Sequence, residues 1–134
     1  MIDHKQYAEY VRYVAQAHQE HVLPTAKAMR VFPSGEKNPY FTHTLWCSMM
    51  MLLDTQLPEN LRDAGAVALL FHDVLEDTSS PLPDSLSPEA VQFVHEIPNS
   101  IHIAPPPGMS RISLRIWLVC VDSHSLRGRS LNCY

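Results

Sequence analysis

The sequence predicts an all-α fold: a compact helical bundle followed by an irregular, proline-rich C-terminal segment. Two observations lead to this prediction. Apolar residues recur at steps of three and four, which is the spacing of amphipathic helices. Clusters of proline, serine, glycine and asparagine separate these stretches and cannot continue a helix. A chain of 134 residues suits one domain. We expect its helical core over residues 1–97, and a linker with a C-terminal segment over residues 98–134.

The first helix is expected between residues 4 and 22. Its apolar stripe consists of Tyr7, Tyr10, Val11, Val14 and Ala17. Residues 32–39 are dense in helix breakers and indicate a loop. At the end of this loop, Asn38 has the character of an N-cap and Pro39 that of a first helical residue.

Three further helices are expected, from about Pro39 to Asp54, from about Pro58 to Asp77, and from about Ser87 to Glu96. Residues 78–88 separate the last two, because their three prolines and four serines cannot continue a helix. The stretch from Pro98 to Gly108 indicates a loop or an extended linker. The apolar run after it is ambiguous between a buried helix and a strand.

Composition narrows the classes of function. The 46% apolar and 18% charged content is typical of a globular protein. A net charge of -4 offers no basic stripe for long nucleic acid, although a small phosphorylated substrate stays open. With no secretory signal and no apolar run of roughly 20 residues, we expect a cytoplasmic protein without a membrane partner. Cys47, Cys120 and Cys133 lack C-x-x-C spacing and are expected to be reduced thiols.

Four polar side chains share one arc of the third expected helix. At about 100° per residue, Asp73, Glu76 and Asp77 project within about 140° of His72. The opposite, core-facing arc consists of Val67, Ala68, Phe71, Val74 and Leu75. The plain alternative is that the four polar residues form the solvated side of the helix.

Two features favour a functional site instead. Leu69 and Leu70 project into the same arc one turn earlier, so this face passes from apolar packing into polar groups. Three carboxylates near the negative end of a helix are unfavourable without a cation. His72 and Asp73 can both reach one ion, and such a mixed set suits manganese, iron, zinc or magnesium to different degrees. A third ligand is needed, and His43 is the candidate, with a purely structural histidine as the alternative.

These motifs resemble those of the HD phosphohydrolase superfamily. PYFTHT followed by LLFHDVLEDT is similar to its signature of an isolated His, a later His-Asp doublet and a distal Asp, here His43, His72 and Asp73. N-P-Y-x-x-H and H-D-V-x-E-D-T are similar to the hydrolase domain of alarmone (ppGpp) pyrophosphohydrolases. The resemblance covers residues 38–97 and implies an HD-like bundle with a divalent metal, for which we expect manganese before iron, zinc or magnesium.

The resemblance also implies roles for other residues. Glu76 and Asp77 match a Glu and an Asp that take part in catalysis in the alarmone group. The family places its last metal ligand in a pattern like A-D-x-x-x-N-L-R, and Asp122 in VDSHSLR is the matching candidate, one residue short. The alternative is that Asp122 merely ends an apolar segment. Thr44 also departs from the pattern, because alarmone hydrolases usually have Pro there.

Basic side chains and the remaining histidines carry weaker signals. Lys37 is a candidate contact for a substrate phosphate, as are Lys27 and Arg30, with a solvated role as the alternative for each. Three further histidines are expected at the surface or at the edge of the core, namely His18, His21 and His95.

The resulting expectation is a metal-dependent phosphohydrolase acting on a nucleotide-type phosphate or pyrophosphate ester, with an alarmone 3'-pyrophosphohydrolase as the leading example. A deoxynucleotidase is the alternative enzyme. A catalytically impaired HD-like module that binds metal or nucleotide is the alternative of another class, and a plain helical interaction domain is a third. Metal content and a nucleotide panel discriminate among them.

Overall fold

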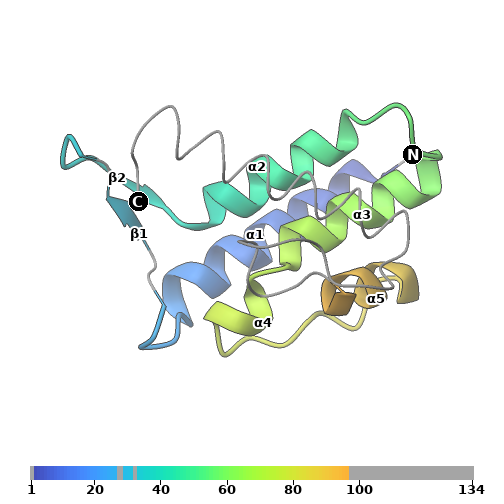
Figure 1. The fold of residues 1–134 in the computed structure, drawn as a ribbon. Coiled ribbons are helices and arrows are strands. Elements are labelled where there is room, and N and C mark those ends of the chain that lie inside the picture. Colours follow the sequence, from blue (N-terminus) through green and yellow to red (C-terminus); the bar gives the residue numbers. More distant parts are fainter. Residues whose placement is uncertain (1, 27–28, 32, 97–134) are drawn as a thin grey trace.

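The computed structural model describes residues 2–26, 29–31 and 33–96, and it confirms the predicted all-α bundle (Figure 1). Three long helices run beside one another and a fourth packs against the third. The elements are α1 (His4–Glu20), β1 (Met29–Val31), β2 (Lys37–Pro39), α2 (Phe41–Leu52), α3 (Glu59–Phe71), α4 (Val74–Asp77) and α5 (Pro88–Glu96). Among these elements, no helix combines the length and the apolar character needed to cross a membrane. The prediction for residues 98–134 lies outside the described residues.

The first helix begins and ends close to its predicted bounds. The carboxylate of Asp3 caps α1 by accepting a hydrogen bond from the backbone N–H of Lys5 at 3.0 Å. At the other end, the N–H of His21 donates to the carbonyl of Ala17. The side chains that α1 buries are Tyr10, Val14, Ala17 and His18. The apolar stripe therefore predicts the buried face, and a histidine lies on that face as well.

The start of the second helix is predicted wrongly. Asn38 and Pro39 belong to β2, which pairs antiparallel with β1, and Asn38 lies opposite Arg30. The helix begins only after Tyr40, which occupies its N-cap position without a side-chain hydrogen bond. Gly35 has a φ of 86°, a left-handed conformation that favours glycine in the turn between the strands. The backbone of Asn38 is thus committed to a hairpin, which excludes it from the helix N-terminus.

The third predicted helix is divided. α3 ends at Phe71, and α4 follows only after His72 and Asp73, which cap the two helices. The continuous helix predicted through Asp77 is therefore wrong. The division changes which side chains face inward, because Leu75, predicted in the core, is 43% exposed. Val74, the first residue of α4, still packs in the core, so only Leu75 of the predicted core-facing arc turns outward after the junction.

Helices α1, α2 and α3 share one core. Its largest fully buried members include Phe71, Met51, Leu69, Leu70 and Val14. A polar contact crosses this core: the Ser48 hydroxyl donates to the carbonyl of Ala66 at 2.7 Å, and the Tyr7 hydroxyl lies 2.7 Å from it. Because the Ser48 proton is committed to Ala66, Tyr7 is the donor to Ser48. These bonds connect α1, α2 and α3 at one point.

A short backbone bridge holds α4 against the end of α1. Val22 and Thr78 form an isolated antiparallel bridge, flanked by two hydrogen bonds. The N–H of Leu23 donates to the carbonyl of Asp77 at 2.8 Å, and the N–H of Ser79 donates to the carbonyl of His21 at 2.9 Å. The end of α1 and the segment after Asp73 are therefore fixed relative to each other.

Candidate metal centre

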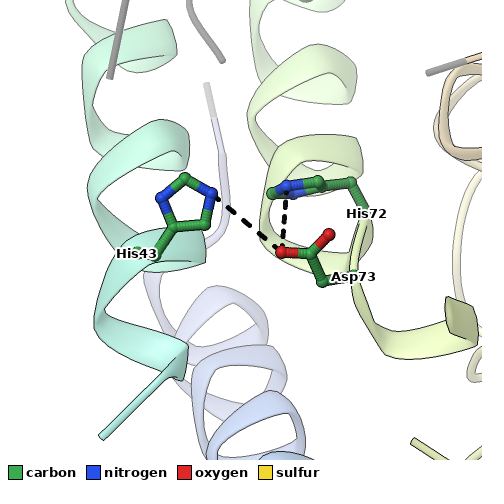
Figure 2. Close-up of side chains that lie close together, drawn as sticks. All are labelled: His43, His72 and Asp73. Atoms are coloured by element: carbon green, nitrogen blue, oxygen red, sulfur yellow. Dashed lines mark ion pairs between the residues drawn. The ribbon is translucent and has the colours of Figure 1, made fainter. Parts of the chain in front are cut away.

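Three of the predicted ligands come together. His43, His72 and Asp73 each offer one ligand atom, and these atoms all lie within 4.8 Å of one another. The Nε2 of His72 is 3.2 Å from Oδ2 of Asp73, and the Nε2 of His43 is 4.0 Å from the same oxygen (Figure 2). All three residues are buried. We refer to them as the ligand cluster.

Two separate parts of the fold supply the ligand cluster. His43 lies in the first turn of α2, and its ring faces the junction between α3 and α4 (Figure 2). His72 and Asp73 form that junction. The contact between α2 and α3 is the most extensive between helices in the described chain, and Ser48 fixes it. The spacing of His43 from the His-Asp doublet is thus set by the packing of two helices.

Hydrogen bonding fixes the tautomer of His72. Its Nδ1 lies 2.5 Å from the carbonyl oxygen of Leu69, which can only accept, so Nδ1 carries a proton and donates it. The remaining nitrogen, Nε2, faces the carboxylate of Asp73. A bare nitrogen and a carboxylate oxygen at this distance would repel each other. A proton or a metal ion must therefore bind between them.

Charge around His72 favours a positive species at this point. Burial acts to lower the pKa of the His72 imidazole. Four groups act in the opposite direction and together outweigh burial, so the pKa of His72 is raised: the negative charge of Asp73, the neighbouring Cys47, the carbonyl of Leu69 and the more distant Asp77. The same environment that favours an imidazolium also favours a cation bound at Nε2. Donation by His72 to a backbone carbonyl is a common arrangement for a metal-ligating imidazole.

The donor set fits a divalent transition metal. Two ligand atoms held at about 2.1 Å from one ion lie at most about 4.2 Å apart. The two distances to Asp73, 3.2 and 4.0 Å, fall within that limit. Two imidazoles and one carboxylate suit manganese, iron or zinc, and three protein ligands leave positions open for substrate and water. His43 also lies near the buried thiol of Cys47, whose Sγ is 3.8 Å from Nδ1.

Glu76 and Asp77 follow the cluster on α4. Glu76 lines a pocket of about 200 Å³ together with His72, Leu75, Val94 and His95. Burial and the negative charge of Asp73 raise the pKa of Glu76, with His72 acting in the opposite direction. Burial, followed by the charges of Asp73 and Glu76, raises the pKa of Asp77 to about 6. Both carboxyls thus respond to the charge at Asp73.

Two histidines near the cluster were not predicted as site residues. His95, on α5, is exposed as expected but lines the pocket beside Glu76. The prediction for His18 is wrong, because this side chain is completely buried. A histidine among the apolar positions of the α1 stripe is the signal that could have indicated its burial. His21 is exposed at the end of α1, as predicted.

Other predicted site residues lie elsewhere. Lys37 is exposed on β2, outside the ligand cluster and its pocket, and its proposed phosphate contact stays a prediction. Arg30 lies in β1, opposite Asn38. Lys27 and Asp122 lie outside the described residues. Thr44 is buried in α2 and its hydroxyl donates to the carbonyl of Phe41, so the departure from proline is accommodated within a helix.

The fold has a counterpart among solved structures. A metazoan ortholog of SpoT that hydrolyses ppGpp, with a role in starvation responses, is similar to this chain with a TM-score of 0.69 and 18% identity. The similarity covers 100% of this chain and 76% of the other. The chain has the fold of that ppGpp hydrolase. The fold of a ppGpp hydrolase, expected from the sequence motifs, is thereby confirmed. No protein-family model and no curated protein matches the sequence.

Proposed function

We propose that this chain is a metal-dependent phosphohydrolase acting on a nucleotide-type phosphate or pyrophosphate ester. The observation that carries the proposal is the convergence of His43 with the adjacent His72 and Asp73, two imidazoles and a carboxylate from two separate parts of the fold, within 4.8 Å. A divalent metal bound there, manganese first, would polarise the phosphoryl group and lower the pKa of a water. The shared fold with a ppGpp hydrolase supports the same class of reaction.

The ligand cluster would bind the metal, and residues of α4 would transfer protons. His43, His72 and Asp73 would hold the ion, with the Nδ1 of His72 anchored on the carbonyl of Leu69. Glu76 lines the pocket that also contains His72, so its carboxylate can orient the attacking water and accept a proton from it.

Asp77 would act as a second acid/base or water-positioning group. Its pKa, raised to about 6, lies close to neutrality, where a carboxyl can both hold and release a proton. The bridge between Val22 and Thr78 fixes the backbone beside Asp77. A group with an adjusted pKa on a fixed backbone is suited to repeated proton transfer.

The substrate class follows from the fold and from charge. The net charge of -4 disfavours long nucleic acid, whereas a small anion needs only the local positive charge of a bound ion. Among small phosphorylated substrates, we place ppGpp and related 3'-pyrophosphates first, because the ppGpp hydrolase shares the fold. Lys37 is the proposed contact to a phosphate.

A nucleotide panel tests the proposal. The full chain would be assayed with Mn²⁺ for release of phosphate and pyrophosphate from ppGpp, other nucleotides and deoxynucleoside triphosphates, beside Asp73→Ala. We expect Mn²⁺-dependent pyrophosphate release from ppGpp by the wild type and none by Asp73→Ala. Turnover of deoxynucleotides alone would indicate the deoxynucleotidase instead. Stoichiometric Mn²⁺ binding without any turnover would indicate an impaired binding module and would overturn the enzymatic proposal.

A further inference from the structure

His18 is a buried histidine outside the ligand cluster. It lies in the last turn of α1 and is completely buried. Neither ring nitrogen has a hydrogen-bond partner among the described residues. Burial lowers the pKa of His18, although the charge of Asp73 acts to raise it. The lowered pKa favours a neutral ring. A neutral imidazole has one N–H to donate and one nitrogen that accepts, and buried groups of this kind are nearly always satisfied.

The ring of Tyr40 lies between His18 and His43 in a chain of ring contacts. Its ring centroid is 5.6 Å from that of Tyr40, whose own centroid is 5.9 Å from that of His43. The charges of Asp73 and His72 act in opposite directions on the pKa of His18, the first raising it and the second lowering it. The bridge between the end of α1 and the end of α4 holds this arrangement.

His18 is not one of the three residues whose ligand atoms gather around a single point. A group other than the ion is therefore the partner to consider for its nitrogens. The groups that occupy the open positions of a three-ligand site are oxygens, either of water or of a substrate phosphate. A neutral imidazole can donate its N–H to either oxygen.

We propose that His18 is a further binding residue of this site, which donates a hydrogen bond to an oxygen of the species held at the ligand cluster. That oxygen belongs to a phosphoryl group or to a water. The inference rests on the proposed function, because it requires an ion at His43, His72 and Asp73. It assigns a role to a side chain that would otherwise be a buried polar group without compensation from the residues that the structure describes.

A purely structural role makes a different prediction. If His18 only packs its ring against Tyr40, phenylalanine should serve equally well for binding. A ring of similar shape without polar atoms removes the unsatisfied nitrogens, so His18→Phe should leave the melting temperature unchanged or raise it. A binding role predicts that the same variant loses affinity for its ligand. A variant that keeps its melting temperature but loses affinity is thus expected only if His18 contacts the bound species.

The test uses the full chain, Mn²⁺ and inorganic phosphate. Mn²⁺ binding is measured by calorimetry, and phosphate binding by the paramagnetic relaxation of its ³¹P signal with Mn²⁺-loaded protein. We expect His18→Phe to melt no lower than the wild type and to bind about tenfold more weakly, the size of one lost hydrogen bond. Loss confined to phosphate identifies a phosphoryl oxygen, and loss confined to Mn²⁺ identifies a water. His18→Gln, which keeps a donor, should retain most of the affinity.

Control variants separate this inference from the proposed function. The exposed His21, near the end of the same helix, gives the matched variant His21→Gln, which should bind as the wild type does. If the wild type binds Mn²⁺ and Asp73→Asn does not, while both His18 variants bind Mn²⁺ and phosphate normally, the role of His18 is overturned and the metal site stands. If the wild type itself binds no Mn²⁺, both are overturned. If His18→Phe does not fold, His18→Ala replaces it in the test. Normal binding of Mn²⁺ and phosphate by His18→Ala would then overturn the inference.

Discussion

The Nε2 atom of His43 lies 4.0 Å from the Oδ2 atom of Asp73, across the packed surfaces of α2 and the junction between α3 and α4. This distance exceeds the donor–acceptor distance of a charge-assisted hydrogen bond, which is about 2.7 to 2.9 Å. It suits two ligands of one ion, which lie at most about 4.2 Å apart. His43 and Asp73 are distant in the sequence, and the packing of the helices brings them together.

Asp73→Asn should remove most of the stabilisation that Mn²⁺ gives. An ion that binds only the folded chain stabilises it by about 2.7 kcal/mol at 100 times its dissociation constant. We expect Mn²⁺ to raise the melting temperature of the wild type and to change that of the variant little, because the variant lacks the anionic ligand of the cluster. Asp84→Asn, which changes an exposed carboxylate, should respond as the wild type does. Equal shifts in all three proteins would contradict the assignment of Asp73.

Glu76→Gln should lower turnover while leaving the metal in place. Glu76 is not one of the clustered ligands, so calorimetry should give the wild-type affinity for Mn²⁺. Loss of a general base costs roughly 10² to 10⁴ in rate. We expect kcat for ppGpp to fall by about that factor, and Glu89→Gln on the exposed start of α5 to leave kcat unchanged. A variant with normal kcat would exclude Glu76 from proton transfer.

Asp77→Asn should stabilise the metal-free protein near neutral pH. Burial and the charges of Asp73 and Glu76 raise the pKa of Asp77 from 3.8 to about 6. The folded state therefore binds the proton more tightly than the unfolded state does. Its contribution to stability is fully present below about pH 4 and is lost as the pH rises through about 6.

Melting temperatures measured with a chelator from about pH 4 to about pH 7 test this sign. The difference between Asp77→Asn and the wild type should grow in favour of the variant as the pH rises across this range. Asp84→Asn, which changes an exposed carboxylate, is measured beside it as the control. A difference that shrinks with rising pH would mean that Asp77 gains stabilising partners when ionised.

Ser48→Ala should weaken the packing of the helices that carry the cluster. The variant loses the bond to Ala66 and leaves the Tyr7 hydroxyl without its acceptor. We expect the free energy of unfolding to fall by about 1 to 3 kcal/mol, measured by urea denaturation. Tyr7→Phe should cost less, because Ser48 keeps its bond to Ala66. If the double variant loses the sum of the two single losses, the Tyr7–Ser48 contact is not a coupled pair.

The sequence predicts the fold well where helical periodicity is long. The stripe of α1 and its end near His21 are visible as repeated apolar spacing, and the structure places both close to where the spacing does. The hairpin of β1 and β2 is not visible in this way. Its strands are three residues each, too short for an alternating pattern, and Asn38 with Pro39 resembles a helix start. Pairing across the hairpin overrides that local preference.

The junction at His72 and Asp73 could not be predicted from breaker residues. No proline or glycine lies between Ala66 and Ser80, so the sequence looks like one continuous helix there. The members of the cluster are nevertheless visible as motif residues, because the His-Asp doublet and the upstream His43 are chemically unusual. Their convergence depends on packing, and so does the burial of His18, which a one-dimensional pattern does not determine.

Anomalous X-ray diffraction at the manganese edge, from crystals of the full chain grown with Mn²⁺, tests the metal site most directly. The account predicts one strong anomalous peak bounded by Nε2 of His43, Nε2 of His72 and an oxygen of Asp73, each about 2.0 to 2.3 Å away. The absence of a peak at this position in crystals that contain Mn²⁺, or a peak held by other residues, would contradict it.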